Sequence, residues 1–185
     1  MLDPYDRPVL GHDDLRLRAP VAADIDARLE LGSHFEILRM FGATEAPQAY
    51  TRAMAQDWVD AQLNEPHAYV IEQAGRLVGA LRLHSIAPHD KRASLAIALL
   101  NPSTLGQGIG TRAMSILLDH VFGTLELHRI SIRVIDYNDR AIAAYKKLGF
   151  QIEGRKREAA QVGDARHDDI MMGLLTHEWK DVTRT

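Results

Sequence analysis

The sequence predicts a mixed α/β (α+β) fold, in which a mostly antiparallel central sheet is flanked by helices. Segments that alternate apolar and polar residues gather in the middle and at the end of the chain. Segments with apolar residues at helical spacing lie before and between them. No internal repeat, low-complexity stretch or linker divides the 185 residues. We therefore expect one domain over residues 14–180, preceded by an N-terminal arm at residues 1–13.

The N-terminal third predicts one strand followed by two helices. Leu15–Arg18 alternates as a strand does. Residues 24–41 carry apolar residues at helical spacing, with a break expected near Gly32-Ser33. A second helix is expected over residues 48–63, and Pro66 closes it.

The middle of the chain predicts a β meander. Its three expected strands are residues 68–72, 77–86 and 94–100, and the last is apolar enough for the centre of a sheet. Short polar turns at residues 73–76 and 88–91 connect them. Strands joined by turns this short pair antiparallel.

The C-terminal part predicts a helix, a strand, a second helix and two final strands. Asn138 is suited to cap the second helix, and Gly149 is suited to end it. The expected elements are helix 109–121, strand 130–134, helix 138–148 and strands 151–157 and 168–175, with a turn at residues 162–164. The full order is β-α-α-β-β-β-α-β-α-β-β.

Composition excludes several classes of protein. The chain contains no cysteine, which excludes disulfides, thiolate metal sites and a cysteine nucleophile. Its nine histidines include no HExxH pair, so we expect no metal. No apolar run approaches the roughly 20 residues of a membrane span. The N-terminus, MLDPYDRPVL, lacks the basic patch and apolar run of a secretory signal, which predicts a cytoplasmic protein.

Charge is unevenly distributed along the chain, although the net charge is only −3. Residues 1–60 hold 11 acids and 6 bases, a balance of −5, whereas residues 61–185 hold 14 acids and 16 bases, a balance of +2. Neither part has the dense basic stripe of a nucleic-acid-binding protein. The asymmetry suits a first part that binds a cation and a second part that binds an anion, or two ordinary solvated surfaces.

A glycine-rich segment between an expected buried strand and an amphipathic helix is the densest local signal. It reads Leu105-Gly106-Gln107-Gly108-Ile109-Gly110-Thr111. Unpaired N–H groups and the helix dipole favour an anion such as a pyrophosphate at such a place, although a glycine-rich turn without a ligand is the alternative. A Walker loop would need a lysine here, and a dinucleotide fingerprint would need glycine in place of Thr111.

A second segment, Asn138-Asp139-Arg140-Ala141-Ile142-Ala143-Ala144-Tyr145-Lys146-Lys147-Leu148-Gly149-Phe150, follows in the expected second helix. With the glycine segment, the opening Leu15–Pro20 and Asp24, and the tail at residues 153–158 and 168–175, it resembles the GNAT superfamily of acyl-CoA-dependent N-acetyltransferases. The tail resembles the branch of ribosomal-protein N-terminal (alanine/serine) acetyltransferases and spermidine acetyltransferases. The resemblance covers nearly the whole chain and implies the GNAT fold, acetyl-CoA as acyl donor and an amine as acceptor.

The resemblance also implies which residues bind the cofactor. Residues Gly106, Gln107, Gly108, Ile109, Gly110 and Thr111 would hold the CoA pyrophosphate. The backbone of Ile97, Ala98 and Leu99 would pair with the pantetheine arm. Asn138 would contact the cofactor, act as a helix cap, or do both. Lys147 would reach a CoA phosphate or be merely solvated. Leu105 departs from the family, which commonly has Arg or Gln at that position.

For the chemistry, the resemblance implies that Tyr145 is the general acid that protonates the leaving CoA thiolate; the alternative is a tyrosine packed in the core. The general base is left open. Two positions that are often acidic in the family hold Arg133 and Ser94 instead. The remaining candidates are Glu36, Glu72 and His84.

The function expected from the resemblance is acetyl transfer to a primary amine. Because the chain has no cysteine, we expect direct transfer in a ternary complex. A protein N-terminal α-amine is the leading acceptor, since its pKa of about 7.7–8.0 leaves a useful neutral fraction without a strong base. The alternatives are a polyamine or another small amine, including an aminoglycoside, and a non-catalytic acyl-CoA-binding sensor. A homodimer is one option, with Trp58 or Trp179 at the contact unless either packs within the monomer.

Overall fold

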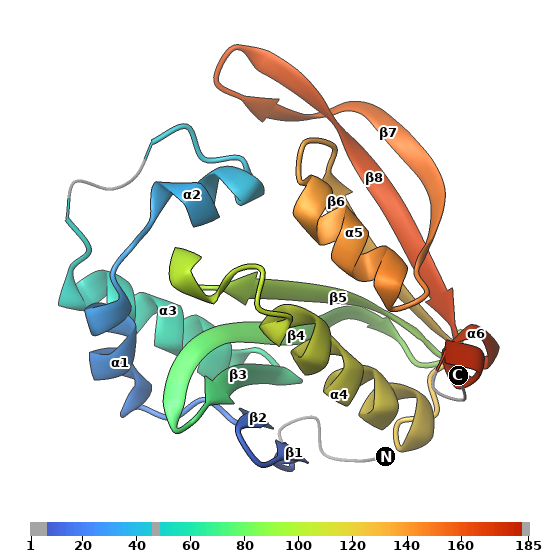
Figure 1. Ribbon diagram of the computed structural model, residues 1–185, viewed down its shortest axis with the longest axis horizontal. Coiled ribbons are helices and arrows are strands. Elements are labelled where there is room, and N and C mark those ends of the chain that lie inside the picture. The colour runs from blue at the N-terminus through green and yellow to red at the C-terminus, as the bar shows by residue number, and fades with distance from the viewer. Residues whose placement is uncertain (1–6, 46–48, 183–185) are drawn as a thin grey trace.

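The computed structural model describes residues 7–45 and 49–182, and within them one eight-stranded sheet carries helices on both faces (Figure 1). The strand order is β1-β2-β3-β4-β5-β6-β8-β7, and all neighbouring strands are antiparallel except β5 and β6, which are parallel. The predicted mixed, mostly antiparallel sheet is thus confirmed. The strands are β1 Leu10–His12, β2 Leu15–Arg18, β3 Ala68–Gln73, β4 Arg76–Ala87, β5 Arg92–Leu99, β6 Arg129–Ile135, β7 Gln151–Val162 and β8 Ala165–Leu175.

The helices are α1 Asp24–Leu31, α2 Phe35–Leu38, η1 Arg39–Phe41, α3 Arg52–Asn64, η2 Pro102–Thr104, α4 Ile109–Gly123, α5 Asp139–Lys147 and α6 Thr176–Val182. The break expected near Gly32 is confirmed, because Gly32 ends α1 with a positive φ of 62°. The expected start of the next helix at residue 48 lies outside the described residues, and α3 begins only at Arg52. Thr51 sets that start, since its side chain accepts a hydrogen bond from the backbone N–H of Met54 at 3.3 Å.

Two elements were not expected from the sequence. Part of the predicted N-terminal arm forms β1, in which Leu10 lies opposite Leu17 of β2. A three-residue strand is too short to show alternation, so only its pairing reveals it. The C-terminal α6 packs Trp179 against Phe122, with ring centroids 6.5 Å apart, and the Trp179 indole N–H donates to Asp119. Trp179 is therefore buried within the chain rather than available at a surface contact.

The main core lies between the sheet and helices α4 and α5. The apolar stripe predicted for residues 109–121 is confirmed, because Ile109, Ala113, Leu117 and Val121 are all buried in this core. Smaller apolar clusters on the opposite face join α1 and α3 to β3 and β4, and Trp58 packs against them. The sheet thus has an α4 face and an α3 face.

Strands β5 and β6 pair over only part of their length. The parallel ladder joins residues 92–94 to residues 129–131 and stops there. Both strands then continue, to Leu99 and Ile135 respectively, without pairing to each other, and they diverge (Figure 1). One backbone edge of residues 95–99 is consequently left open in the middle of the sheet.

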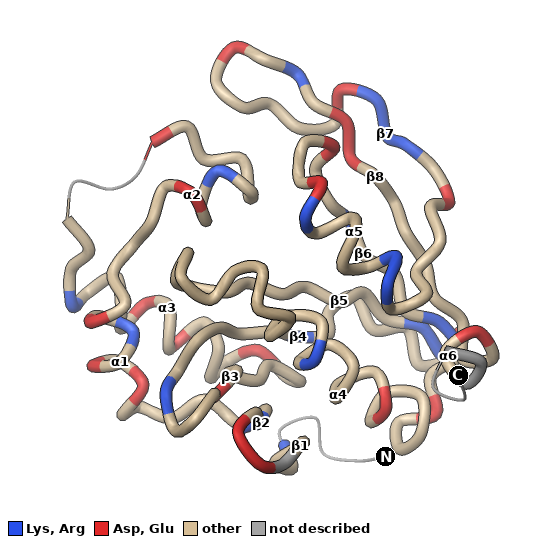
Figure 2. Tube along the Cα trace, viewed as in Figure 1, with Lys and Arg blue, Asp and Glu red and all other residues tan. Residues whose placement is uncertain are grey.

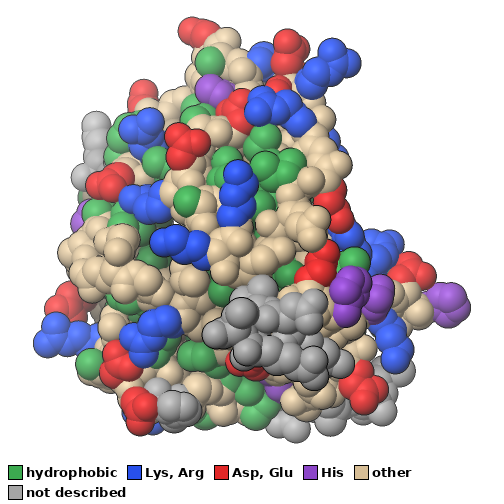
Figure 3. All heavy atoms as spheres, turned by 45° about the vertical axis from the view of Figure 1, so that its right-hand side comes forward, with side chains coloured by type: hydrophobic (Ala, Val, Ile, Leu, Met, Phe, Trp, Pro, Cys, Tyr) green, Lys and Arg blue, Asp and Glu red, His purple; other side chains and the backbone are tan. Residues whose placement is uncertain are grey.

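Charged side chains of both signs are interspersed over one face of the molecule (Figure 3). None of the helices in the described part of the chain combines the length and the apolarity needed to cross a membrane.

Candidate active site

A cleft of about 1070 Å³ occupies the split between β5 and β6. It is large enough for an extended small-molecule ligand. Almost all of the site residues expected from the resemblance line it: Ile97, Ala98, Leu99, Leu105, Gly106, Gly108, Ile109, Gly110, Thr111, Asn138, Tyr145 and Lys147. Gln107 does not line the cleft; it is exposed, and its side-chain amide donates to the carbonyl of Ser103 at 2.6 Å.

The glycine segment presents a row of free backbone donors at the start of α4. Gly106 and Gly108 both adopt a φ of +75°, a backbone angle that residues with a Cβ rarely adopt. Gly108 is the residue that immediately precedes α4. Among the described residues, no hydrogen-bond acceptor meets the N–H groups of residues 106–111. Aligned N–H groups at a helix start favour an anion. The donor set therefore fits a pyrophosphate, although Leu105 adds no side-chain donor.

The open edge of β5 lies beside this loop. Residues 95–99 bond to β4 on one edge, whereas their other edge borders the cleft. Backbone N–H and C=O groups along such an edge need partners, and an extended arm with amide groups can supply them. This edge therefore fits the pantetheine arm expected at Ile97, Ala98 and Leu99.

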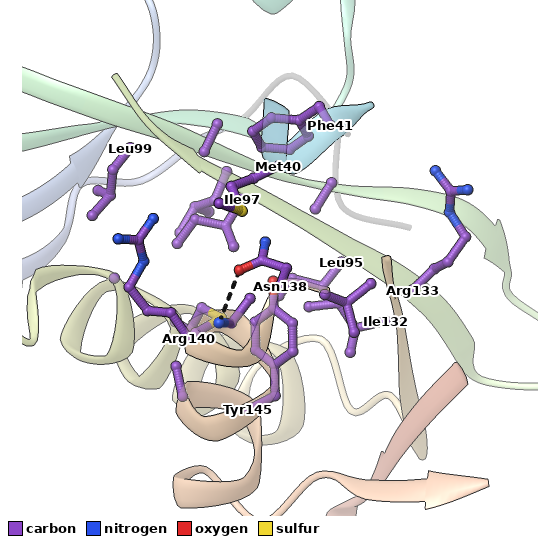
Figure 4. Close-up of a pocket in the computed structure, with 18 of the residues that line it drawn as sticks. Met40, Phe41, Leu95, Ile97, Leu99, Ile132, Arg133, Asn138, Arg140 and Tyr145 are labelled. Atoms are coloured by element: carbon purple, nitrogen blue, oxygen red, sulfur yellow. Dashed lines mark hydrogen bonds between the residues drawn. The ribbon is translucent and has the colours of Figure 1, made fainter. Parts of the chain in front are cut away.

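Helix α5 supplies the opposite wall of the cleft. The side-chain oxygen of Asn138 accepts a hydrogen bond from the N–H of Ala141 at 3.2 Å, so Asn138 caps the helix while it also lines the cleft (Figure 4). Lys147 lies exposed in the last turn of α5, at the margin of the same cleft.

Tyr145 lies on the buried face of α5 and points toward Asn138 and the cleft, close to Leu95 and Ile132 (Figure 4). The residue is only 7% exposed, and its ring packs 6.0 Å from that of Phe150. Within the described residues, its hydroxyl has no hydrogen-bond partner. Burial raises the pKa of Tyr145 to about 12. The phenol therefore keeps its proton at physiological pH and can donate it. Tyr145 both packs in the core and lines the cleft.

Strand alternation divides the cleft into two sides. Leu95 and Ile97 of β5 pack with the core on the α4 face. Arg82 and His84 of β4 lie opposite Ala96 and Ser94 in the ladder, so all four point to the α3 face. We call these the α4 side, which includes the glycine segment and Tyr145, and the α3 side, which includes Arg82, His84 and Ser94.

Two of the three candidate bases lie away from the cleft. Glu72 of β3 does not line it, and its carboxylate is held by Arg18, whose Nε lies 2.7 Å away. Glu36 of α2 is also outside the lining and is paired with Arg140 at 3.6 Å. A carboxylate that is bonded to a guanidinium outside the cleft is not placed to reach an acceptor inside it. Neither geometry suits proton removal from an acceptor in the cleft.

His84 does line the cleft, on its α3 side. Burial lowers the pKa of His84, and the neighbouring cations Arg82 and Arg133 lower it further, against an opposing contribution from Glu65. The imidazole is therefore neutral at physiological pH and able to accept a proton. Its Nδ1 lies 3.1 Å from the Ser85 hydroxyl.

Charge in the cleft does not follow the charge balance along the chain. The charge balance of the sequence suited a first part that binds a cation, or two ordinary solvated surfaces, and the members of residues 1–60 that line the cleft are uncharged: Ile37, Met40, Phe41, Gly42 and Trp58. The described acidic positions of this part lie along α1, α2 and α3, at the β1–β2 turn and in the loop after η1 (Figure 2). Only the fold shows which side chains of these helices face inward.

The charged residues that do line the cleft are mostly cations that sequence reasoning missed. They are Arg82, Arg133, Arg140, Lys147 and a single acid, Asp169. Asp169 is buried and accepts a hydrogen bond from Arg133 at 2.9 Å. Alternation along β4 could have placed Arg82 beside His84, but not the cleft beneath them. Among the described residues, no three His, Asp or Glu side chains gather as metal ligands would.

A short segment, α2 with η1, covers the α3 side of the cleft with Ile37, Met40 and Phe41. It is tied to the loop before α5, because the Tyr137 hydroxyl donates to the carbonyl of Arg39. The Glu36–Arg140 ion pair makes a second connection to α5. The wall of the cleft is therefore assembled from segments about 100 residues apart in the sequence.

Comparison with known proteins identifies relatives among the GNAT acetyltransferases. A family model described as "Acetyltransferase (GNAT) domain" matches residues 14–151. A Bacillus subtilis protein named "Putative ribosomal N-acetyltransferase YdaF" is 28% identical over 174 residues, which span 91% of this chain and 94% of that protein. The spermidine N(1)-acetyltransferase of Escherichia coli K12 is 30% identical over 111 residues, 60% of this chain and 59% of that enzyme.

Solved structures share the fold. A GCN5-related N-acetyltransferase from Brucella melitensis superposes with a TM-score of 0.82 at 22% identity, covering 97% of this chain and 83% of that one. A spermidine N-acetyltransferase from Vibrio cholerae in complex with CoA and spermine gives a TM-score of 0.74 at 23% identity, covering 91% and 99% of the two chains.

Proposed function

The chain belongs to the GNAT family of acetyltransferases and is an acetyl-CoA-dependent N-acetyltransferase, and from that premise we propose that its acceptor is the α-amine of a protein N-terminus. Its relatives include enzymes named for ribosomal proteins and for spermidine, so similarity alone does not choose between these acceptors. The choice rests on the charge of the cleft.

The observation that carries the proposal is the excess of cations over acids in the lining. Of the four Arg and Lys residues that line the cleft, Arg133 is paired with Asp169 and Arg140 with Glu36, so Arg82 and Lys147 keep their charge and the one acid of the lining is already occupied. A polyamine or an aminoglycoside carries several positive charges, which this lining repels. A protein N-terminus brings only one amine. Nearby cations lower the pKa of that amine, so that more of it is present as the neutral nucleophile.

In the proposed reaction, the glycine segment and the open edge of β5 hold acetyl-CoA. The amine nitrogen attacks the thioester carbon, the new C–N bond forms and the C–S bond breaks. His84 accepts the proton that the amine loses, and Tyr145 donates a proton to the departing thiolate. Transfer is direct, since the chain has no cysteine to carry an acyl group.

The test is thiol release from acetyl-CoA with matched acceptors at equal concentration. The panel contains short peptides with free N-termini, the same peptides with blocked N-termini, spermidine and an aminoglycoside. We expect the highest kcat/KM with free N-terminal peptides and none with the blocked forms. A higher kcat/KM for spermidine or the aminoglycoside would contradict the proposal.

A further inference from the structure

Arg82 is a charged side chain on the α3 side of the cleft that has no hydrogen-bond or ion-pair partner among the residues that the structure describes. It lies at the centre of β4, opposite Ala68 on one neighbouring strand and Ala96 on the other. Its Nε is buried without a hydrogen-bond partner, and in the part of the chain that the structure describes its guanidinium forms no ion pair. A buried donor of this kind is normally satisfied, so Arg82 is suited to receive an acceptor group from a ligand.

Gln62 of α3 makes a second, independent observation on the same side. It is only 7% exposed, it lines the cleft, and within residues 7–45 and 49–182 its amide has no hydrogen-bond partner. Unlike the Nε of Arg82, which is fully enclosed, the polar atoms of Gln62 keep some exposure. Two polar side chains are thus left without partners where the cleft reaches the α3 face.

The charges around Arg82 leave its own charge uncompensated. Arg133 is neutralised by Asp169, and His84 is neutral at physiological pH. Glu65 acts on His84 but does not line the cleft. The ligand group that this arrangement fits is a carboxylate, which a guanidinium can bind with two hydrogen bonds.

The spacing of Arg82 and His84 sets where that carboxylate must lie. The two side chains are two residues apart on one face of β4, which corresponds to about 7 Å along the strand. An extended peptide covers roughly the same distance in two residues. An acceptor whose amine meets His84 therefore presents its second or third side chain to Arg82.

We propose that Arg82 binds an acidic side chain of the acceptor, so that the preferred substrates are protein N-termini with Asp or Glu at the second or third position. This inference rests on the proposed function, because it assumes that the acceptor is a peptide α-amine. Gln62 contributes a hydrogen bond to the same acceptor segment.

The experiment compares peptides that differ only at one position, with Glu, Gln or Lys at residue two, and a second series with the same changes at residue three. Thiol release gives kcat/KM for each peptide. With the unmodified enzyme we expect Glu to exceed Gln by about tenfold in at least one series, chiefly through KM, because a charge-assisted hydrogen bond is replaced by a neutral one. Arg82→Gln should reduce that ratio to about twofold or less. The KM for acetyl-CoA should not change.

Two further variants serve as controls for this experiment. Arg76→Gln makes the same chemical change at the exposed start of β4, outside the cleft lining, and should keep the full preference for Glu. Arg82→Glu should reverse the preference toward the Lys peptide, a gain that misfolding cannot produce. Acetylation of all peptides without a Glu preference, or a preference that survives in Arg82→Gln, would overturn this inference and leave the proposed function standing. Turnover of spermidine but of no peptide would overturn both.

Discussion

At position 145, the tyrosine ring is buried, whereas its hydroxyl is not fully enclosed, has no hydrogen-bond partner among the described residues and lies at a cleft whose charged lining residues are mostly cations. A hydroxyl in this setting can donate its hydrogen bond to a ligand in the cleft. In the proposed reaction, the developing thiolate is the group that accepts it. His84 has the opposite role, because its neutral imidazole accepts a proton rather than donating one.

For Tyr145, we expect Tyr145→Phe to lower kcat by about 100-fold, the usual scale of general acid catalysis, with little change in CoA affinity. Phenylalanine preserves the ring contact with Phe150, so the melting temperature should stay close to that of the unmodified enzyme. Steady-state kinetics and calorimetry with CoA make the measurement. Because burial raises the pKa of Tyr145 to about 12, its deprotonation should not lower activity up to about pH 10. An unchanged kcat would remove the role.

For His84, we expect a distinct pH signature. Because its pKa is lowered by burial and by Arg82 and Arg133, the imidazole becomes a competent base as pH rises through a value below the ordinary 6.5. The kcat/KM of the unmodified enzyme should therefore rise there, and again near pH 7.7–8.0 as a peptide α-amine loses its proton. His84→Gln should lower kcat/KM by roughly 10–100-fold and keep only the second rise. Identical pH profiles would show that another group accepts the proton.

Among the elements, the entry of the chain into α4 and the divergence of β5 from β6 position the site. The glycine segment lies between the end of β5 and the first turn of α4, where the chain changes direction. Its positive φ angles let the N–H groups of the first helical turn face the cleft. Conformation, rather than lack of space, makes glycine necessary at Gly108, since a Cβ there would meet no atom within 4 Å.

Two glycine substitutions test whether backbone conformation, rather than available space, requires glycine at position 108. Gly108→Ala should destabilise the protein by about 1–2 kcal/mol, because an L-residue is placed at φ +75°. Gly110→Ala is the matched control: Gly110 is helical, and its added Cβ would lie 3.8 Å from the side chains of Ile97 and Leu99, an ordinary contact. That variant should be as stable as the unmodified enzyme or gain up to about 1 kcal/mol. Urea unfolding gives both values, and equal losses would contradict this account.

Across the whole molecule, both faces of the sheet contribute to one cleft. The α4 side offers the glycine segment and Tyr145, and the α3 side offers His84 and Arg82, so donor and acceptor would approach from different faces and meet in the split. With two separate approaches, both substrates can be bound at the same time.

We accordingly expect sequential kinetics. Initial rates measured over a grid of acetyl-CoA and peptide concentrations should give intersecting double-reciprocal lines. Mass spectrometry of the enzyme after exposure to acetyl-CoA alone should show no acetylated species on a catalytic residue. Parallel lines together with a stable acyl-enzyme would contradict direct transfer.

Much of this architecture was predictable from local patterns. Alternation located β2 to β6, helical spacing located α1, α3, α4 and α5, and glycine with Asn138 marked the starts of α4 and α5. Elements that lack a pattern of their own were missed: β1 is too short for alternation, and α6 owes its place to the packing of Trp179. The position of the acidic residues was not predictable, because a count of charges along the chain does not say which side of a helix faces inward.

By itself, the sequence predicted the fold class and a phosphate-type loop and excluded a cysteine nucleophile, since these depend on composition and on residues that are neighbours in the chain. Its resemblance to the GNAT superfamily added Tyr145 as the candidate acid. Only the tertiary structure decided that Glu72 and Glu36 are held elsewhere, that His84 reaches the cleft, and that Arg82 and Gln62 face it without partners in the described part of the chain. The physical reason is that proton affinity and charge selectivity depend on burial and on neighbours across strands. Residues 62, 82 and 169 come to line one cleft only once β4, β8 and α3 have folded around the split sheet.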